Sequence, residues 1–210
     1  MYLSRLKVDP LKRTTREIRL RPYRLHQVVL RAFPEENDGG PGRVLYRLDV
    51  DRNGGTSLLV QSEKKPEWEK ASMLKECLLE PAEWRSYFPG CRTGQDLYFR
   101  LRANPAVKKQ GEGRKNGYRL GLLREEDQLA WLQRKAQEGG FALLNCQTVP
   151  EGVVHSEEGR RDGKLTHYAV RFEGVLRVVD PDAFVETIAS GIGPGKGFGF
   201  GLLSIAPLRS

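Results

Sequence analysis

The stretch 22-PYRLHQVVLRAFP-34 predicts a single amphipathic helix. Pro22 suits the first helical turn, because its ring holds φ near the helical value and its missing backbone N–H is not needed there. Apolar residues then recur at helical spacing and form one stripe: Leu25, Val28, Val29, Ala32 and Phe33. Pro34 ends the pattern, because proline cannot continue a helix. We expect a helix that begins at Pro22 and buries this stripe in a core.

Strand patterns flank the helix on both sides. Tyr2–Val8 alternates apolar and polar residues, and a basic connector, Lys12–Arg21, joins it to the helix. After the helix, Val44–Val50 and Ser57–Ser62 alternate on either side of the sequence DRNGG (Asp51–Gly55). Asn-Gly between two alternating runs is typical of a hairpin turn. The chain therefore begins with the order strand, helix, strand, strand.

A mixed segment with helical character (Pro66 to Cys91) and a clear strand (Asp96–Arg102) complete the first half. The resulting order is that of a ferredoxin-like βαββαβ domain, which we place at residues 1–108. The polar, basic sequence KKQGEGRKN that follows is typical of a linker, placed at 109–116.

Residues 117–210 repeat the order. The expected elements are, in sequence, a strand at Tyr118–Leu123, a helix at Glu125–Glu138, extended runs at Phe141–Gln147 and Val153–His155, a strand at Tyr168–Val179, a helix at Pro181–Ala189 after Asp180 as N-cap, and a strand at Phe200–Ala206. The predicted fold class is therefore α+β, with two tandem ferredoxin-like (RRM-like) βαββαβ domains.

Positive charge is concentrated at the start of the chain. The formal net charge is +8, and residues 1–33 hold nine Lys and Arg against two acidic residues. Such clustering is typical of a protein that binds a polyanion, nucleic acid first of all. A solvated basic face and an anionic membrane surface remain as alternatives.

Several protein classes are disfavoured by composition. No run approaches the roughly 18 apolar residues that span a membrane, and the N-terminus has no apolar core of signal-peptide length, so we expect a cytoplasmic protein. The three cysteines, Cys77, Cys91 and Cys146, have no CxxC spacing and predict neither a disulfide framework nor a zinc site.

Glycine occupies every second position from 191 to 201 in GIGPGKGFGFGLLSIAP. A Walker-type loop needs a hydroxyl residue after its lysine, but Gly197 follows Lys196. The lack of Cβ atoms at Gly193, Gly195 and Gly197 lets backbone N–H groups reach phosphate oxygens, to which Lys196 adds charge. The alternative is a flexible linker or a strained turn between helix and strand.

The histidines and acidic residues show no spacing that is typical of a metal site. His26, His155 and His167 lack metal-ligand spacing, and the acidic pairs are explained by helix capping and a surface loop. We therefore expect no metal and no cofactor.

Tyr23 and His26 are three residues apart on the predicted first helix, at the edge of its apolar stripe. Basic side chains surround them, among them Arg21, Arg24 and Arg31. RNA is cut without metal when a base takes the 2′-hydroxyl proton, an acid protonates the 5′-oxygen and cations stabilise the phosphorane. His26 and Tyr23 meet these requirements, although half-buried packing is the common role of such residues.

Further RNA contacts are predicted in two places. Arg100 and Arg102 share the solvent-facing side of their strand with Tyr98, and the loop EEGRRDGK carries Arg160, Arg161 and Lys164 at its tip. The alternative for the loop is a solvated hairpin tip.

These features together resemble a known family, the CasE CRISPR-RNA processing endoribonucleases of the type I-E Cascade complex, within the RAMP superfamily. The segments that carry the resemblance are PYRLHQVVLRAFP, LYFRLRANPAVKK and GIGPGKGFGFGLLSIAP. The resemblance implies metal-independent cleavage of CRISPR repeat RNA at the 3′ base of its stem-loop. The products would be a 2′,3′-cyclic phosphate (or 3′-phosphate) and a 5′-hydroxyl, with the hairpin retained within Cascade.

The resemblance also implies residue roles. His26 corresponds to the family's catalytic histidine and Tyr23 to its assisting tyrosine. Arg160, Arg161 and Lys164 would grip the stem, and Lys196 would contact phosphate. Two alternatives from other classes stay open: a non-catalytic subunit that binds an RNA stem-loop, and a metal-dependent nuclease.

Overall fold

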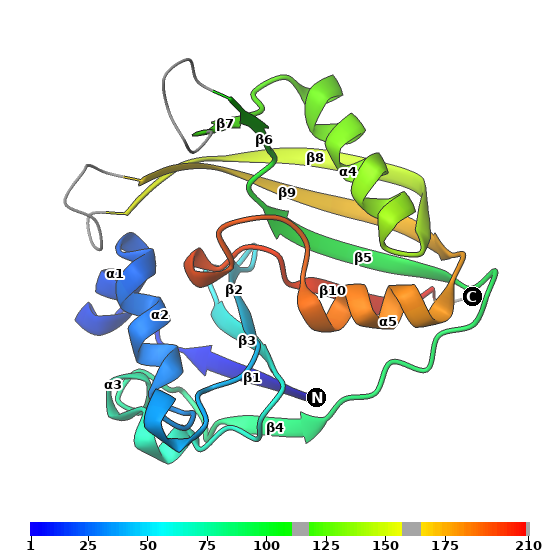
Figure 1. The fold of residues 1–210 in the computed structure, drawn as a ribbon. Helices are drawn as coiled ribbons and strands as arrows, with labels where there is room; N and C mark the ends of the chain where they lie inside the picture. The colour runs from blue at the N-terminus through cyan, green and yellow to red at the C-terminus, as the bar shows by residue number, and fades with distance from the viewer. Residues whose placement is uncertain (111–117, 157–164, 209–210) are drawn as a thin grey trace. The chain divides into compact units, whose positions relative to one another are not determined.

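The computed structural model describes residues 1–110, 118–156 and 165–208. These residues form two compact units (Figure 1). The first unit consists mainly of Met1–Pro89, and Lys196–Gly199 also belongs to it. The second consists mainly of Gly90–Val154 and Thr166–Gly195. No helix among the described residues has the length and apolar character needed to cross a membrane.

The first unit is one antiparallel sheet with helices on one face. Its elements are β1 (Tyr2–Val8), α1 (Arg13–Leu20), α2 (Pro22–Leu30), η1 (Glu36–Asp38), β2 (Val44–Val50), β3 (Thr56–Ser62), η2 (Trp68–Lys70), α3 (Ser72–Lys75) and β4 (Glu83–Ser86). The strand order is β2-β3-β1-β4, with Leu6 and Leu48 both opposite Leu58. This is the strand order of a ferredoxin-like domain, in the βαββαβ sequence that was predicted.

The apolar stripe of α2 supplies the core of this unit, as predicted. All five stripe residues are buried, and they pack with sheet residues that share one face, among them Leu6, Tyr46, Leu58 and Val60. The helix itself ends at Leu30, and turn hydrogen bonds from the Ala32 and Phe33 amides continue the chain. Burial of this stripe therefore fixes the rotation of α2 on the sheet.

One expectation for this unit was wrong. Lys12–Arg21, expected to be a basic connector, contains the helix α1 over Arg13–Leu20. Thr15 and Ile18 are buried, and the other residues of α1 are exposed or partly exposed. The helix packs beside α2 (Figure 1). With so small an apolar face, the segment carries almost no hydrophobic pattern, and only tertiary packing reveals the helix.

The second unit repeats the topology. Its elements are β5 (Asp96–Ala103), β6 (Ala106–Lys109), β7 (Tyr118–Gly121), α4 (Glu125–Glu138), β8 (Phe141–Ser156), β9 (Leu165–Val178), α5 (Pro181–Ser190) and β10 (Leu203–Pro207). The main sheet has the order β10-β5-β9-β8. The Asp180 carboxylate accepts hydrogen bonds from the Asp182 and Ala183 amides, so it caps α5 as predicted. The predicted α+β fold with two tandem ferredoxin-like domains is confirmed.

The strand Asp96–Ala103 differs from its predicted place. It was assigned to a first domain of residues 1–108, but it forms β5 of the second sheet, where Leu101 pairs with both Phe172 and Leu203. The first sheet is instead completed by β4, whose four residues are all exposed and show no apolar alternation. The chain leaves the first unit near Pro89, well before residue 108.

The predicted linker, 109–116, falls almost entirely outside the described residues. On either side of it, β6 and β7 pair antiparallel with Lys108 opposite Arg119, and both strands belong to the second unit.

The glycine-rich segment has a backbone reason for its alternation. Five of its six alternating glycines have positive φ, which side-chain-bearing residues rarely adopt: Gly191, Gly193, Gly195, Gly199 and Gly201. A Cβ on Gly193 would lie 2.9 Å from the ring of Trp131, a buried residue of the second unit. Only Gly197, in the short η3 helix (Lys196–Phe198), lacks positive φ. The extended run expected from Phe200 begins at Leu203.

We predict that Gly193→Ala destabilises the protein more than Gly54→Ala. Both glycines have φ near +80°, but a Cβ on Gly54 meets no atom within 4 Å. The backbone conformation alone costs alanine about 1–2 kcal/mol, and at Gly193 the clash with Trp131 adds to that cost. Denaturant unfolding of the two variants measures the difference, and equal losses would contradict the role assigned to the Trp131 contact.

Candidate functional site

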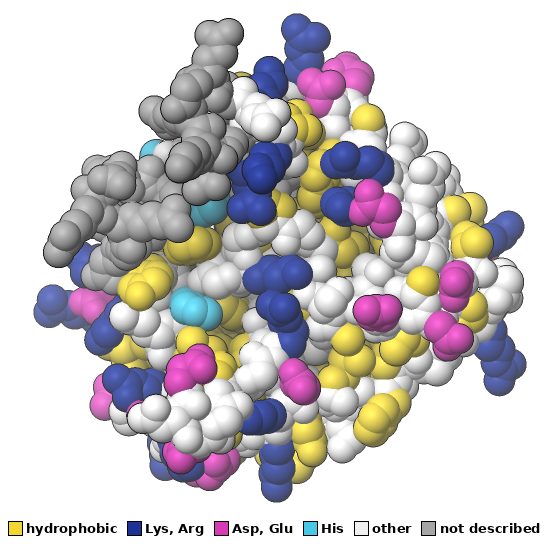
Figure 2. All heavy atoms as spheres, in the orientation of Figure 1, with side chains coloured by type: hydrophobic (Ala, Val, Ile, Leu, Met, Phe, Trp, Pro, Cys, Tyr) yellow, Lys and Arg dark blue, Asp and Glu magenta, His cyan; other side chains and the backbone are white. Residues whose placement is uncertain are grey.

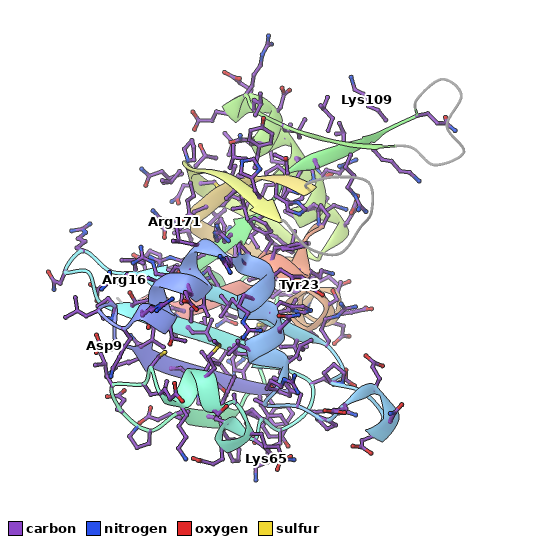
Figure 3. All side chains as sticks on the ribbon, turned by 90° about the vertical axis from the view of Figure 1, so that its left-hand side faces the viewer. Asp9, Arg16, Tyr23, Lys65, Lys109 and Arg171 are labelled. Carbon is purple, nitrogen blue, oxygen red and sulfur yellow. The ribbon has the colours of Figure 1, made fainter. Side chains whose placement is uncertain are left out.

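Tyr23 and His26 lie together on the first turns of α2, as their spacing predicts. Their ring centroids are 6.4 Å apart, and both side chains are half-buried. In Figure 3, Tyr23 lies on the side of the first unit that carries α1 and α2. Because α2 is held by Leu25, Val28 and Val29, which are buried, the two rings sit at the edge of the core.

Two further residues of the first unit surround the His26 imidazole. The ring of Tyr46, on β2, lies 6.2 Å from it between centroids, with 24° between the ring planes. A Cβ built on Gly197 would lie 3.6 Å from His26 Nε2 and Cε1, an ordinary contact distance. The backbone of η3 therefore lies next to the imidazole, with room for little more than a Cβ between them.

The surroundings of His26 favour its neutral form. Burial lowers the pKa of His26, because removal from water penalises the imidazolium. His26 Nδ1 is buried and has no hydrogen-bond partner among the described residues. No hydrogen bond at Nδ1 therefore fixes the tautomer of His26, and a neutral ring with its proton on Nδ1 leaves Nε2 free to accept another. A neutral imidazole at the edge of the core is suited to accept a proton near pH 7.

Cationic side chains lie on the same helix and in η3. Burial, and then the positive charge of Arg43, lower the pKa of the half-buried Lys196 ammonium. Arg21, Arg24 and Arg31 are exposed on or beside α2. A guanidinium nitrogen of Arg31 lies 4.0 Å from a carboxylate oxygen of Glu35. Lys and Arg side chains are spread over the face drawn in Figure 2, with Asp and Glu side chains among them. The first unit thus brings η3, the segment that contains Lys196, against α2 and next to the imidazole.

Tyr98 and Arg100 are exposed on β5, as predicted, whereas Arg102 is only partly exposed and both arginines are engaged by carboxylates. Arg102 Nε lies 2.7 Å from a Glu151 oxygen, and its guanidinium carbon lies 4.6 Å from the centre of the Phe200 ring. Only 19% of the Arg102 side chain is exposed, while Arg100 forms an ion pair with Glu173. These carboxylates come from distant strands, so the sequence around β5 gives no sign of them. An RNA phosphate would have to compete with these ion pairs.

The structure describes only some of the other residues that were predicted to contact RNA. Gly193 and Gly195 belong to the second unit, where a Cβ on Gly195 would lie 2.9 Å from the Phe200 ring. Arg160, Arg161 and Lys164 lie outside the described residues.

Two polar residues with a structural part in these sites were missed by the sequence analysis. Tyr46 was predicted only as a member of the alternating strand Val44–Val50, with no role for its hydroxyl. Asn104, 5% exposed, donates from Nδ2 to Nδ1 of His167 (2.9 Å) and accepts from the Tyr168 amide (3.1 Å). Because its oxygen is engaged by that amide, Asn104 leaves Nδ1 of His167 as the acceptor, which fixes the neutral tautomer of this second histidine.

A metal site is not evident in the part of the chain that the structure describes. No three His, Cys, Asp or Glu side chains come together there in a way that would hold a metal ion.

Comparison with known proteins places this chain in a family. A family model described as "CRISPR associated protein" matches residues 1–207. The CRISPR-associated endoribonuclease Cse3 of Thermus thermophilus is 36% identical, over 99% of this chain and 100% of that protein. The Cascade subunit CasE of Escherichia coli K12 is 32% identical over the same shares.

The fold agrees as well. A structure of Thermus thermophilus Cse3, bound to an RNA that represents a pre-cleavage complex, superimposes with a TM-score of 0.80. It is 35% identical, and the match covers 98% of each chain. This chain therefore belongs to the CasE/Cse3 family of CRISPR-associated proteins.

Proposed function

We propose that this protein is a metal-independent endoribonuclease that cuts CRISPR repeat RNA at the 3′ base of its stem-loop. The observation that carries the proposal is the half-buried imidazole of His26, whose burial favours the neutral form and which lies beside Tyr23 and against η3, the segment that contains Lys196. Family membership supports it, since the Thermus relative is named an endoribonuclease and its structure holds a pre-cleavage RNA. The nucleophile of this reaction belongs to the substrate, so the chemistry requires no metal.

In the proposed mechanism His26 acts as the base. Its neutral imidazole takes the proton of the 2′-hydroxyl while that oxygen attacks the adjacent phosphorus. The bond from phosphorus to the 5′-oxygen then breaks, and that oxygen takes a proton from the Tyr23 hydroxyl. Lys196 and the arginines on or beside α2 (Arg21, Arg24 and Arg31) stabilise the added negative charge on the phosphorane. The products are a 2′,3′-cyclic phosphate, which can open to a 3′-phosphate, and a 5′-hydroxyl.

The hairpin product would stay bound after cleavage. Arg160, Arg161 and Lys164 are proposed to grip the stem, and Arg100, Arg102, Gly193 and Gly195 to line its path in the second unit. Because the Escherichia coli relative is named a Cascade subunit, we propose that this chain joins a Cascade complex in the cytoplasm together with its crRNA.

We expect His26→Ala to abolish cleavage while RNA affinity stays within a few-fold. The substitution removes the base but none of the cationic groups. An end-labelled repeat stem-loop is incubated in EDTA with the wild type or the variant, and a parallel substrate carries a single 2′-deoxy group at the cut site. Loss of cleavage with either change supports the mechanism.

Other outcomes of that assay separate the alternatives. Cleavage by His26→Ala at the wild-type rate would contradict the assignment of the base. Tight binding without any cleavage by the wild type would favour a stem-loop-binding subunit, and a cut made only without EDTA would favour a metal-dependent nuclease.

The lowered pKa of His26 predicts how stability depends on pH. In the unfolded chain His26 titrates at its ordinary pKa of about 6.5, whereas the folded state resists its protonation. Acidification below pH 6.5 therefore favours unfolding until the lower, folded-state pKa is passed. We expect the wild type to lose more stability than His26→Gln between pH 7 and pH 5.

Unfolding by urea at several pH values measures this difference. The pKa of His167 is also lowered, by burial and by the charge of Arg119, but His167 is present in both proteins and its contribution cancels. Parallel stability curves for the two proteins would show that folding does not perturb His26.

Lys196→Gln should slow cleavage and weaken RNA binding with a reduced dependence on salt. If Lys196 contacts one phosphate, its loss lowers the slope of log affinity against log salt by about 0.7–0.9. Lys65→Gln is the matched control, because Lys65 lies in the same unit but over the ring of Trp84, 4.5 Å from its centre. Equal slopes for both variants would argue against a phosphate contact by Lys196.

A further inference from the structure

Tyr46 is a buried polar residue that the proposed mechanism does not use. Its side chain is fully buried on β2, on the sheet face that α2 covers. The Tyr46 hydroxyl donates to the backbone carbonyl of Gly197 at 2.7 Å and lies 3.5 Å from the carbonyl of Pro22. A buried phenol generally needs such a partner, because an unpaired hydroxyl in the core is costly.

The two carbonyls belong to the two segments that form the candidate site. Pro22 opens α2, the helix that carries Tyr23 and His26, and Gly197 is the central residue of η3, directly after Lys196. Gly197 is 151 positions from Tyr46 in the chain and Pro22 is 24 positions from it, so only folding brings the three residues together. One hydroxyl therefore lies against both the start of the helix and the segment that faces the imidazole.

The aromatic ring of Tyr46 has a separate effect from its hydroxyl. The ring lies roughly parallel to the His26 imidazole and forms part of its surroundings. Removal of the hydroxyl alone leaves this ring, and with it the burial that lowers the pKa of His26. The Gly197 carbonyl, however, loses the donor that ties η3 to the sheet.

We propose that Tyr46 is a positioning residue for the cleavage reaction. Its hydroxyl holds η3 at the distance from His26 at which the imidazole and the Lys196 ammonium act on the same phosphate. This inference rests on the proposed function. It adds Tyr46, a residue of the sheet, to the residues of α2 and η3 that are proposed to set the cleavage rate. The physical basis is that small displacements of a catalytic group have large effects on rate.

The test is single-turnover cleavage of the repeat stem-loop by Tyr46→Phe at saturating protein. We expect the rate constant to fall about tenfold or more, while the RNA dissociation constant stays within about twofold. The pKa of His26, followed by NMR of its ring protons in the RNA-free protein, should stay at its wild-type value, because the ring at position 46 is kept. Backbone hydrogen exchange in residues 196–199 should become faster.

Leu48→Ala is the matched control. Leu48 lies two residues further along β2 and packs on the same core, so its truncation weakens the same sheet without touching the hydroxyl. A rate loss in Tyr46→Phe but not in Leu48→Ala, with both proteins folded at the assay temperature, supports positioning. Equal losses in both variants would reduce Tyr46 to a stability role, and a wild-type rate in Tyr46→Phe would overturn the proposal.

The outcomes also separate this inference from the proposed function. If the wild type cleaves and His26→Ala does not, the function stands whatever Tyr46→Phe does. If the wild type does not cleave the repeat RNA, the proposed function fails, and the role of Tyr46 in cleavage fails with it.

Discussion

The seating of α2 on the first sheet is the constraint on which the candidate site depends. Leu25, Val28 and Val29 are buried, and each such side chain contributes roughly 1.5–3 kcal/mol when removed from water. The helix therefore has one favourable rotation. That rotation leaves Tyr23 and His26 half-buried at the edge of the core. Buried apolar side chains thus place the two residues that are proposed to act in cleavage.

The half-buried position matters for the imidazole. A histidine exposed to water would titrate near pH 6.5, and one buried at the centre of the core would be out of reach of RNA. At the edge, burial lowers the pKa of His26, so the neutral form is favoured at physiological pH. The ring of Tyr46 and the bare backbone of Gly197 create this environment.

Two groups of arginines, one on or beside α2 and one on β5, have different surroundings in the structure. Arg21, Arg24 and Arg31 are exposed on or beside α2, whereas Arg102 on β5 is engaged by Glu151 and by the ring of Phe200. Likewise, five of the six alternating glycines are explained by positive φ, whereas neither the backbone conformation nor the contacts of Gly197 require a glycine. A charge or a glycine in a sequence therefore does not reveal its role until its neighbours are known.

Local sequence patterns were enough to predict most helices and strands and the type of chemistry. The start of α2 at Pro22, its buried stripe, the cap at Asp180 and the pairing of Tyr23 with His26 follow from spacing and from side-chain chemistry within one or two helical turns. Long-range packing, by contrast, sets the place of Asp96–Ala103 in the second sheet, the helix at Arg13–Leu20 and the contact of Tyr46 with Gly197 beside His26. These depend on contacts between residues far apart in the chain, for which a single sequence carries no periodic signal.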